Sequence, residues 1–217
     1  GLGKTVQAIA FLLGRKAEGN MDSGRRFAMI VCPASLVYNW ENEIQRFTGD
    51  LTAEAIVGNG ELRMERIQHS KADIFLTSYE LLKRDIDQYA DMNFEYLILD
   101  EAQNIKNHLT QNAKAVKSIT AKRRFALTGT PIENSLGELW SIFDFLMPGI
   151  LNSYQRFREQ YELPITVQHD ENAALRLRKL VKPFILRRMK REVLKELPDK
   201  IEEVVYSKME EDQKILY

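Results

Sequence analysis

The chain has 217 residues, 44% of them hydrophobic, so it can bury a substantial core and is not expected to be disordered. Its 31 basic and 31 acidic residues cancel, so any contact with nucleic acid has to come from local basic patches. The lone Cys32 excludes an internal disulfide framework, and the lack of any stretch near the roughly 20 apolar residues of a membrane span predicts an intracellular protein with no membrane partner.

Helical and strand patterns alternate along the first two thirds of the chain. Residues 4–18 have apolar side chains at helical spacing, and residues 27–32 form an apolar run that ends at Pro33, as in a buried strand. Ser35 is then expected to cap a helix whose inward side chains are Leu36, Trp40, Ile44 and Phe47. Further strands are predicted at 54–57, 73–77, 96–99 and 124–127, and helices at 61–69, from 78, at 110–119 and at 136–146.

This alternation predicts an α/β fold, in which a parallel sheet is covered by helices on both faces. In such sheets ligands bind at the carboxyl ends of the strands. The pattern changes after Pro148, because residues 153–196 are helical and richly charged, whereas 201–206 alternate like a strand. We therefore predict a lobe over 1–148, a helical insert over 149–200, and a returning strand with the start of a helix over 201–217.

The first chemical motif is Gly1-Leu2-Gly3-Lys4-Thr5, which resembles the end of a phosphate-binding loop. Glycines let backbone N–H groups approach phosphate oxygens, and the following helix presents its positive N-terminus to them. Lys4 is expected to reach the outer phosphates of ATP, and the Thr5 hydroxyl to bind Mg²⁺. Gly-Lys-Thr also occurs by chance in many proteins, but here it stands directly before an amphipathic helix, as the mechanism requires.

The second motif is the acid pair Asp100-Glu101, which follows the predicted strand 96–99. Asp100 can hold Mg²⁺ through the water shell of the ion, and Glu101 can orient and deprotonate the attacking water. An ordinary acidic turn after a strand is the alternative. An acid pair downstream of Gly-Lys-Thr is much rarer than either motif alone, so the two together favour an ATPase site.

The third motif is Thr128-Gly129-Thr130, again at the end of a predicted strand. Its hydroxyls and glycine can sense the γ-phosphate of ATP and relay its loss to the nucleic-acid side. Taken alone, a capped turn explains these residues better.

Taken in order, these and other segments resemble the Swi/Snf branch of helicase superfamily two, whose members are DNA-dependent ATPases. The resemblance covers essentially the whole chain. It is carried by residues 1–7, 32–36 with 39–40, 77–80, 100–103 with 105–107, 127–134, 183–188 and 197–198. It implies the RecA-like fold of a P-loop NTPase, the cofactors ATP and Mg²⁺, double-stranded DNA as a partner, and a second RecA-like lobe in the same parent chain. The helical insert corresponds to the first protrusion of this branch.

The sequence departs from the pattern of this branch in two respects. The first half of the phosphate loop, the adenine-reading segment and the second lobe with its arginine finger are missing, so we expect the fragment alone to be inactive. Gln103, placed with the catalytic residues, stands where many relatives have His, which looks like a bacterial variant. A bacterial protein is expected in the cytoplasm with the nucleoid, and a eukaryotic one in the nucleus.

The resemblance also implies DNA contacts. Pro33, Ser35, Thr77 and Ser78 are expected at strand ends that face the phosphate backbone, although each can also be a helix cap. Arg187 and Arg188 belong to a basic cluster followed by acidic residues, for which a solvated helix face is the alternative. A nucleotide-dependent DNA-binding switch without turnover is the alternative to a motor enzyme.

Overall fold

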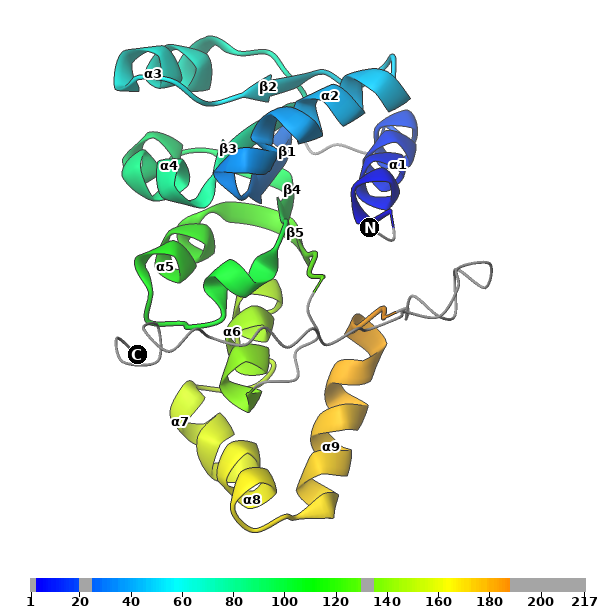
Figure 1. The fold of residues 1–217 in the computed structure, drawn as a ribbon, viewed down its shortest axis with the longest axis vertical. Coiled ribbons are helices and arrows are strands. Elements are labelled where there is room, and N and C mark those ends of the chain that lie inside the picture. The colour runs from blue at the N-terminus through cyan, green and yellow to red at the C-terminus, as the bar shows by residue number, and fades with distance from the viewer. Residues whose placement is uncertain (1–2, 20–24, 130–134, 188–217) are drawn as a thin grey trace, which may run out of the picture. The chain divides into compact units, whose positions relative to one another are not determined.

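The computed structural model describes residues 3–19, 25–129 and 135–187. The chain divides into two units, 1–180 and 181–217, and the sheet belongs to the first. Its five strands are all parallel and follow the order β2-β3-β1-β4-β5 (Figure 1). Their bounds are β1 Arg26–Cys32, β2 Ala53–Ala55, β3 Ile74–Ser78, β4 Asn93–Leu99 and β5 Thr120–Ala126. The predicted parallel α/β fold is confirmed.

The helices occupy the positions that the sequence pattern predicts, with shifts of one to a few residues at their ends. They are α1 Lys4–Ala17, α2 Val37–Phe47, α3 Gly60–His69, α4 Tyr79–Arg84, α5 Gln111–Ser118, α6 Leu136–Leu146, α7 Tyr154–Phe157, α8 Leu163–Thr166 and α9 Glu171–Val181. Short 3₁₀ turns lie at η1 Ala34–Leu36, η2 Ile86–Tyr89, η3 Ala102–Ile105 and η5 Lys182–Phe184, and a π-helical turn, η4, at Arg158–Glu162. Asn59, Ser78, Thr110, Ser135 and Ser153 cap helices by accepting a backbone N–H.

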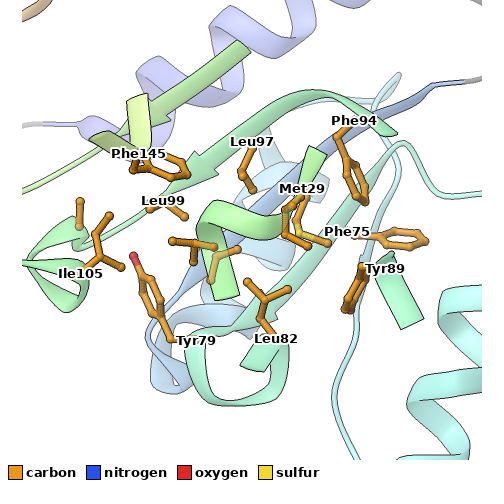
Figure 2. Close-up of a cluster of buried hydrophobic side chains, with 14 of the residues drawn as sticks. Met29, Phe75, Tyr79, Leu82, Tyr89, Phe94, Leu97, Leu99, Ile105 and Phe145 are labelled. Carbon is orange, nitrogen blue, oxygen red and sulfur yellow. The ribbon is translucent and has the colours of Figure 1, made fainter. Parts of the chain in front are cut away.

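Successive residues of the central strands point into two separate hydrophobic layers. In β4, Leu97 and Leu99 join a cluster with α3, α4, α5 and α6. Tyr96 and Ile98 join the opposite cluster with α1 and α2. Figure 2 shows the first layer, in which Phe75, Phe94 and Phe145 pack around Met29 and the leucines of β4. Burial on both faces explains why these strands read as nearly continuous apolar runs.

The start of α2 differs from the prediction. Ser35 does not cap the helix with its side chain, because Pro33 (φ −54°, ψ 143°) leads into a 3₁₀ turn in which Ser35 is exposed. The inward stripe is Val37, Trp40 and Ile44. Phe47 was expected inside, but it lies on the last turn of α2 and is 49% exposed.

The outer strand β5 is longer than predicted, because its first half is polar. Arg123 and Lys122 form ion pairs with Glu95 of β4, whose side chain is only 1% exposed. Among the described strands β5 has one neighbour, β4, so these long side chains extend into solvent from the edge of the sheet. This half of β5 has charged residues in place of apolar ones, so hydrophobic periodicity did not indicate a strand there.

The described residues after Pro148 are helical and contain no strand, and α7 and η4 pack on α6 (Figure 1). Residues 149–180 belong to the same unit as the sheet, and the boundaries predicted at 148 and 200 stay predictions. The strand predicted at 201–206 lies outside the described residues. In the described part of the chain, no helix is long and apolar enough to cross a membrane.

Two substitutions in α2 test this packing. Ile44→Ala is expected to lower the free energy of unfolding by about 2–5 kcal/mol, because it leaves a cavity at a fully buried position. Phe47→Ala, in the same helix, is expected to cost less than about 1 kcal/mol, because the ring is half exposed. Urea unfolding measures both. Equal losses would contradict the packing of α2 described above.

Candidate nucleotide site

The predicted motifs meet at the carboxyl edge of the sheet. Because the strands are parallel, the residues that follow β1, β3, β4 and β5 lie at the same edge. Pro33 follows β1, Ser78 ends β3, Asp100 follows β4, and Thr128 comes two residues after the end of β5. This is the edge where an α/β sheet binds its ligand.

Lys4 reaches this edge from the first turn of α1. Gly3 precedes the helix with φ 78° and ψ 26°, a left-handed conformation that glycine adopts without strain. A Cβ atom placed on Gly129 would lie 3.2 Å from Lys4 Nζ and 3.9 and 4.0 Å from the carboxylate oxygens of Glu101. Residues of all three motifs are therefore neighbours. Thr5 is half-buried on the same turn of α1, while Gly1 and Leu2 lie outside the described residues.

Asp100 is held by protein donors on both carboxylate oxygens. Trp40 Nε1 donates to Oδ2 at 3.0 Å, and the backbone N–H of Glu101 donates to Oδ1 at 2.9 Å. Asp100 is 6% exposed and Trp40 is 1% exposed. The sequence correctly indicated that Trp40 is a core residue, but no spacing signal linked it to a carboxylate 60 positions away.

The backbone turns sharply at Glu101, which has φ 49° and ψ 56°. A non-glycine residue pays a conformational cost in this left-handed region, and such residues cluster at functional sites. The turn ends β4 and starts η3, whose first N–H, that of Ala102, donates to the carbonyl of Leu127 at 2.9 Å. The strained turn thus lies at the second residue of the acid pair. The hydrogen bond of Ala102 ties it to Leu127, just before the third motif.

Gln103 bridges the second and third motifs through the two ends of its amide. Its Nε2 donates to Glu101 Oε2 at 2.7 Å, and its Oε1 accepts from Thr128 Oγ1 at 3.1 Å. A change in either partner therefore reaches the other through one side chain. Thr130, the last residue predicted for this motif, lies outside the described residues.

Two buried groups next to Asp100 stay neutral. Burial, helped by the charge of Asp100, raises the pKa of the Cys32 thiol to about 12. Burial and the same charge raise the pKa of Tyr79 further above its ordinary value. Tyr79 Oη donates to the backbone carbonyl of Asp100 at 2.8 Å, a contact that sequence reasoning missed. Because its phenol remains protonated, Tyr79 keeps this hydrogen bond throughout the neutral range.

The residues predicted to contact DNA differ in their exposure. Pro33 is half-buried and Ser35 is exposed, so both present atoms to solvent at the carboxyl edge. Thr77 is fully buried, and the buried Ser78 uses its hydroxyl to cap α4. Arg187 is exposed in the second unit, and Arg188 lies outside the described residues. The DNA roles of all six stay predictions.

The side chains at this edge fit a magnesium ion that is shared with a nucleotide. Each oxygen of Asp100 accepts one hydrogen bond from the described residues, and a carboxylate oxygen can accept a second contact. The described residues contain no group of three or more acidic, His or Cys side chains that could hold an ion by themselves. Mg²⁺ typically takes one or two protein oxygens and completes its shell with waters and phosphate oxygens.

A parallel sheet with a lysine at a helix N-terminus, an acid pair after a central strand and a coupled third motif defines the class of RecA-like P-loop ATPases. The SNF2-related domain family matches residues 1–217. The chain therefore belongs to this family, and the resemblance seen in the sequence is confirmed.

Individual relatives agree with this assignment. The chain is 39% identical to the putative ATP-dependent helicase/translocase YwqA of Bacillus subtilis over 221 residues and 38% identical to the TATA-binding protein-associated factor MOT1 of Saccharomyces cerevisiae over 237 residues. Both alignments cover 100% of this chain, but only 24% and 13% of those proteins. Relatives thus occur in bacteria and eukaryotes, so the bacterial origin suggested by Gln103 stays a prediction.

The fold also matches a solved structure. The SWI2/SNF2 ATPase core of Sulfolobus solfataricus in complex with dsDNA superimposes with a TM-score of 0.79 at 39% identity. The match covers 100% of this chain and 44% of the Sulfolobus chain. The SWI2/SNF2 ATPase core domain of the same organism matches with a TM-score of 0.74. The chain therefore spans less than half of each of these relatives.

Gly129→Ala tests the convergence of the three motifs. The new methyl group would lie 3.2 Å from Lys4 Nζ, so the ammonium, at the end of a flexible side chain, has to shift by a few tenths of an ångström. We expect affinity for ATP to fall about tenfold, or about 1.4 kcal/mol, while the free energy of unfolding changes by less than about 1 kcal/mol. A fluorescent ATP analogue and urea unfolding measure the two quantities. Unchanged affinity would contradict the placement of Lys4 beside Gly129.

Proposed function

We propose that this chain is the first ATP-binding lobe of a motor that hydrolyses ATP to move along double-stranded DNA and remodel protein–DNA complexes. The observation that carries the proposal is the convergence of Lys4, Glu101 and Gly129 at the carboxyl edge of the sheet. Membership of the SNF2-related family supports it. Relatives described as ATP-dependent helicase/translocase and as an ATPase core in complex with dsDNA agree with the same activity.

In this proposal, Gly1 to Thr5 bind the phosphates of ATP. Thr5 and Asp100 hold Mg²⁺, which neutralises the charge that develops on the phosphates. Glu101 orients the attacking water and removes its proton. Its bond to Gln103 supports this role, because the amide fixes one carboxylate oxygen and leaves the other for the water.

Gln103 and the third motif form the proposed coupling device. Loss of the γ-phosphate changes the contacts of Glu101, and Gln103 passes this change to Thr128, with Gly129 and Thr130 as neighbours. The hydrogen bonds of Gln103 with both partners support this path. They also support glutamine as the residue that makes the link at this position.

Double-stranded DNA is the proposed partner, with contacts at Pro33, Ser35, Thr77, Ser78, Arg187 and Arg188. The exposure of Pro33 and Ser35 favours these two as direct contacts, and the buried Thr77 and Ser78 then act by positioning the end of β3 and the start of α4. A second RecA-like lobe of the parent chain supplies an arginine finger, which is worth about 10³ to 10⁵ in rate, so this lobe alone is inactive. The protein acts where its DNA lies, in the cytoplasm of a bacterium or the nucleus of a eukaryote.

Two substitutions in the full-length protein test the chemistry. Glu101→Gln is expected to lower turnover by about 10²- to 10⁴-fold and to retain ATP binding, because it removes the base but preserves its shape. Lys4→Ala is expected to weaken ATP binding itself. Steady-state hydrolysis and equilibrium nucleotide binding distinguish the two effects. Near-normal turnover of the Glu101→Gln protein would reject Glu101 as the base and, with it, this assignment of the catalytic residues. DNA-controlled nucleotide binding without turnover in the wild type would establish the switch module instead.

The DNA contacts are tested by salt dependence. Affinity for duplex DNA is expected to fall steeply with salt and to vary little with sequence, because the proposed contacts address phosphates. Reversing the charges at Arg187 and Arg188 should weaken binding to all sequences and reduce the slope of log K against log salt by about 2. Fluorescence anisotropy over a salt series measures the slope. An unchanged slope would show that both arginines support the structure of the protein and do not contact DNA.

A further inference from the structure

A buried hydrogen bond joins α2 to the carboxylate proposed to hold the metal ion. Trp40 Nε1 donates to Asp100 Oδ2, and the two residues are only 1% and 6% exposed. The other oxygen accepts from the backbone N–H of Glu101. A carboxylate oxygen accepts about two hydrogen bonds, and among the described residues each oxygen of Asp100 accepts one, so each can take a further contact. Trp40 therefore fixes the orientation of Asp100 without consuming its capacity to bind.

The second tryptophan of the chain shows what a purely structural indole does. Trp140 Nε1 donates to the backbone carbonyl of Asn152 at 3.2 Å, which satisfies its N–H without any ionisable group. Trp40 instead donates to a carboxylate, and such a charge-assisted bond is about twice as strong as one between neutral groups. The two tryptophans thus form a matched pair, in which only one contacts the nucleotide site.

The main chain of Asp100 is held by a second helix. Tyr79, the first residue of α4, donates its hydroxyl to the backbone carbonyl of Asp100. Figure 2 shows Tyr79 within the buried layer, with its hydroxyl near Leu99 and Ile105. The side chain and the main chain of Asp100 are therefore fixed from α2 and α4 separately. The two helices begin close to residues that are expected to face DNA. α2 begins two residues after Ser35, and α4 begins directly after Ser78.

We propose that Trp40 is a positioning residue that holds the Asp100 carboxylate in place for the metal ion and connects it to the DNA-facing start of α2. The proposal rests on the proposed function, because it assigns a role within the same nucleotide site. When DNA phosphates contact Pro33 and Ser35, a shift of η1 and α2 moves the indole and, with it, Oδ2 of Asp100. DNA binding thereby changes the affinity of the site for Mg²⁺.

Trp40→Phe and its matched control Trp140→Phe test this role in the full-length protein. The dissociation constant of a fluorescent ATP analogue is measured with Mg²⁺ and with EDTA, and the ratio gives the gain in affinity that Mg²⁺ provides. Trp40→Phe is expected to reduce this gain about tenfold and to leave binding in EDTA unchanged, because only the orientation of Asp100 is lost. Trp140→Phe is expected to retain the full gain.

The possible outcomes separate the two proposals. A full gain in the Trp40→Phe protein would overturn the positioning role and leave the proposed function intact. Absence of Mg²⁺-dependent nucleotide binding in the wild-type protein would overturn the proposed function, and the positioning role with it. Equal losses in the Trp40→Phe and Trp140→Phe proteins would reduce Trp40 to a packing residue.

A second measurement keeps Trp40 in place and needs neither nucleotide nor metal. Asp100→Ala removes the acceptor of the indole, so the amides of residues 37–47 are expected to exchange with deuterium several-fold faster in the full-length, metal-free protein. Glu101→Gln is the control, because it leaves the bond between Trp40 and Asp100 intact. Equal exchange in the two variants, measured by mass spectrometry, would overturn the proposal even if the Trp40→Phe protein did not fold.

Discussion

The three strands β1, β4 and β5 remain hydrogen-bonded up to and just beyond their last residues, and the site depends on this. The N–H of Asp100 donates to the carbonyl of Val31 at 2.8 Å, and that of Leu127 donates to Leu99 at 2.7 Å. The acid pair therefore leaves the sheet from a position that is held on both sides. A parallel sheet with mismatched strand ends would place the same residues at different depths and separate the motifs.

A buried carboxylate needs hydrogen-bond partners, because an unpaired buried polar group costs several kcal/mol. Asp100 meets this demand through Trp40 on one face of the sheet and through Tyr79 on the other. The raised pKa values of Tyr79 and Cys32 have the same origin, since burial penalises a second charge beside the carboxylate. The hydrophobic layers thus do more than stabilise the fold, because they limit which groups at the site carry charge.

The residues proposed for phosphate and metal binding lie on different kinds of structure from those proposed for coupling. Lys4 is delivered by a helix, and Asp100 by a strand. Glu101 and Gln103 lie on the strained turn and the short η3 that follow, and both residues are only partly buried. The rigid elements therefore set the position of the Asp100 carboxylate, which is proposed to bind the metal ion, and of the Lys4 ammonium. In the proposed mechanism, the turn and its link to Thr128 are the part that responds to the state of the nucleotide.

The sequence by itself determined the parallel α/β fold, nearly every element of the described lobe and the family, because buried strands, helical periodicity and short motifs are local patterns. It also placed Lys4, Asp100 and Glu101 at one edge of the sheet. Only the tertiary structure decided the strand order, the exposure of Phe47 and the bond between Trp40 and Asp100. These features depend on contacts between residues far apart in the chain, and no local pattern encodes which distant partner a buried polar group will find.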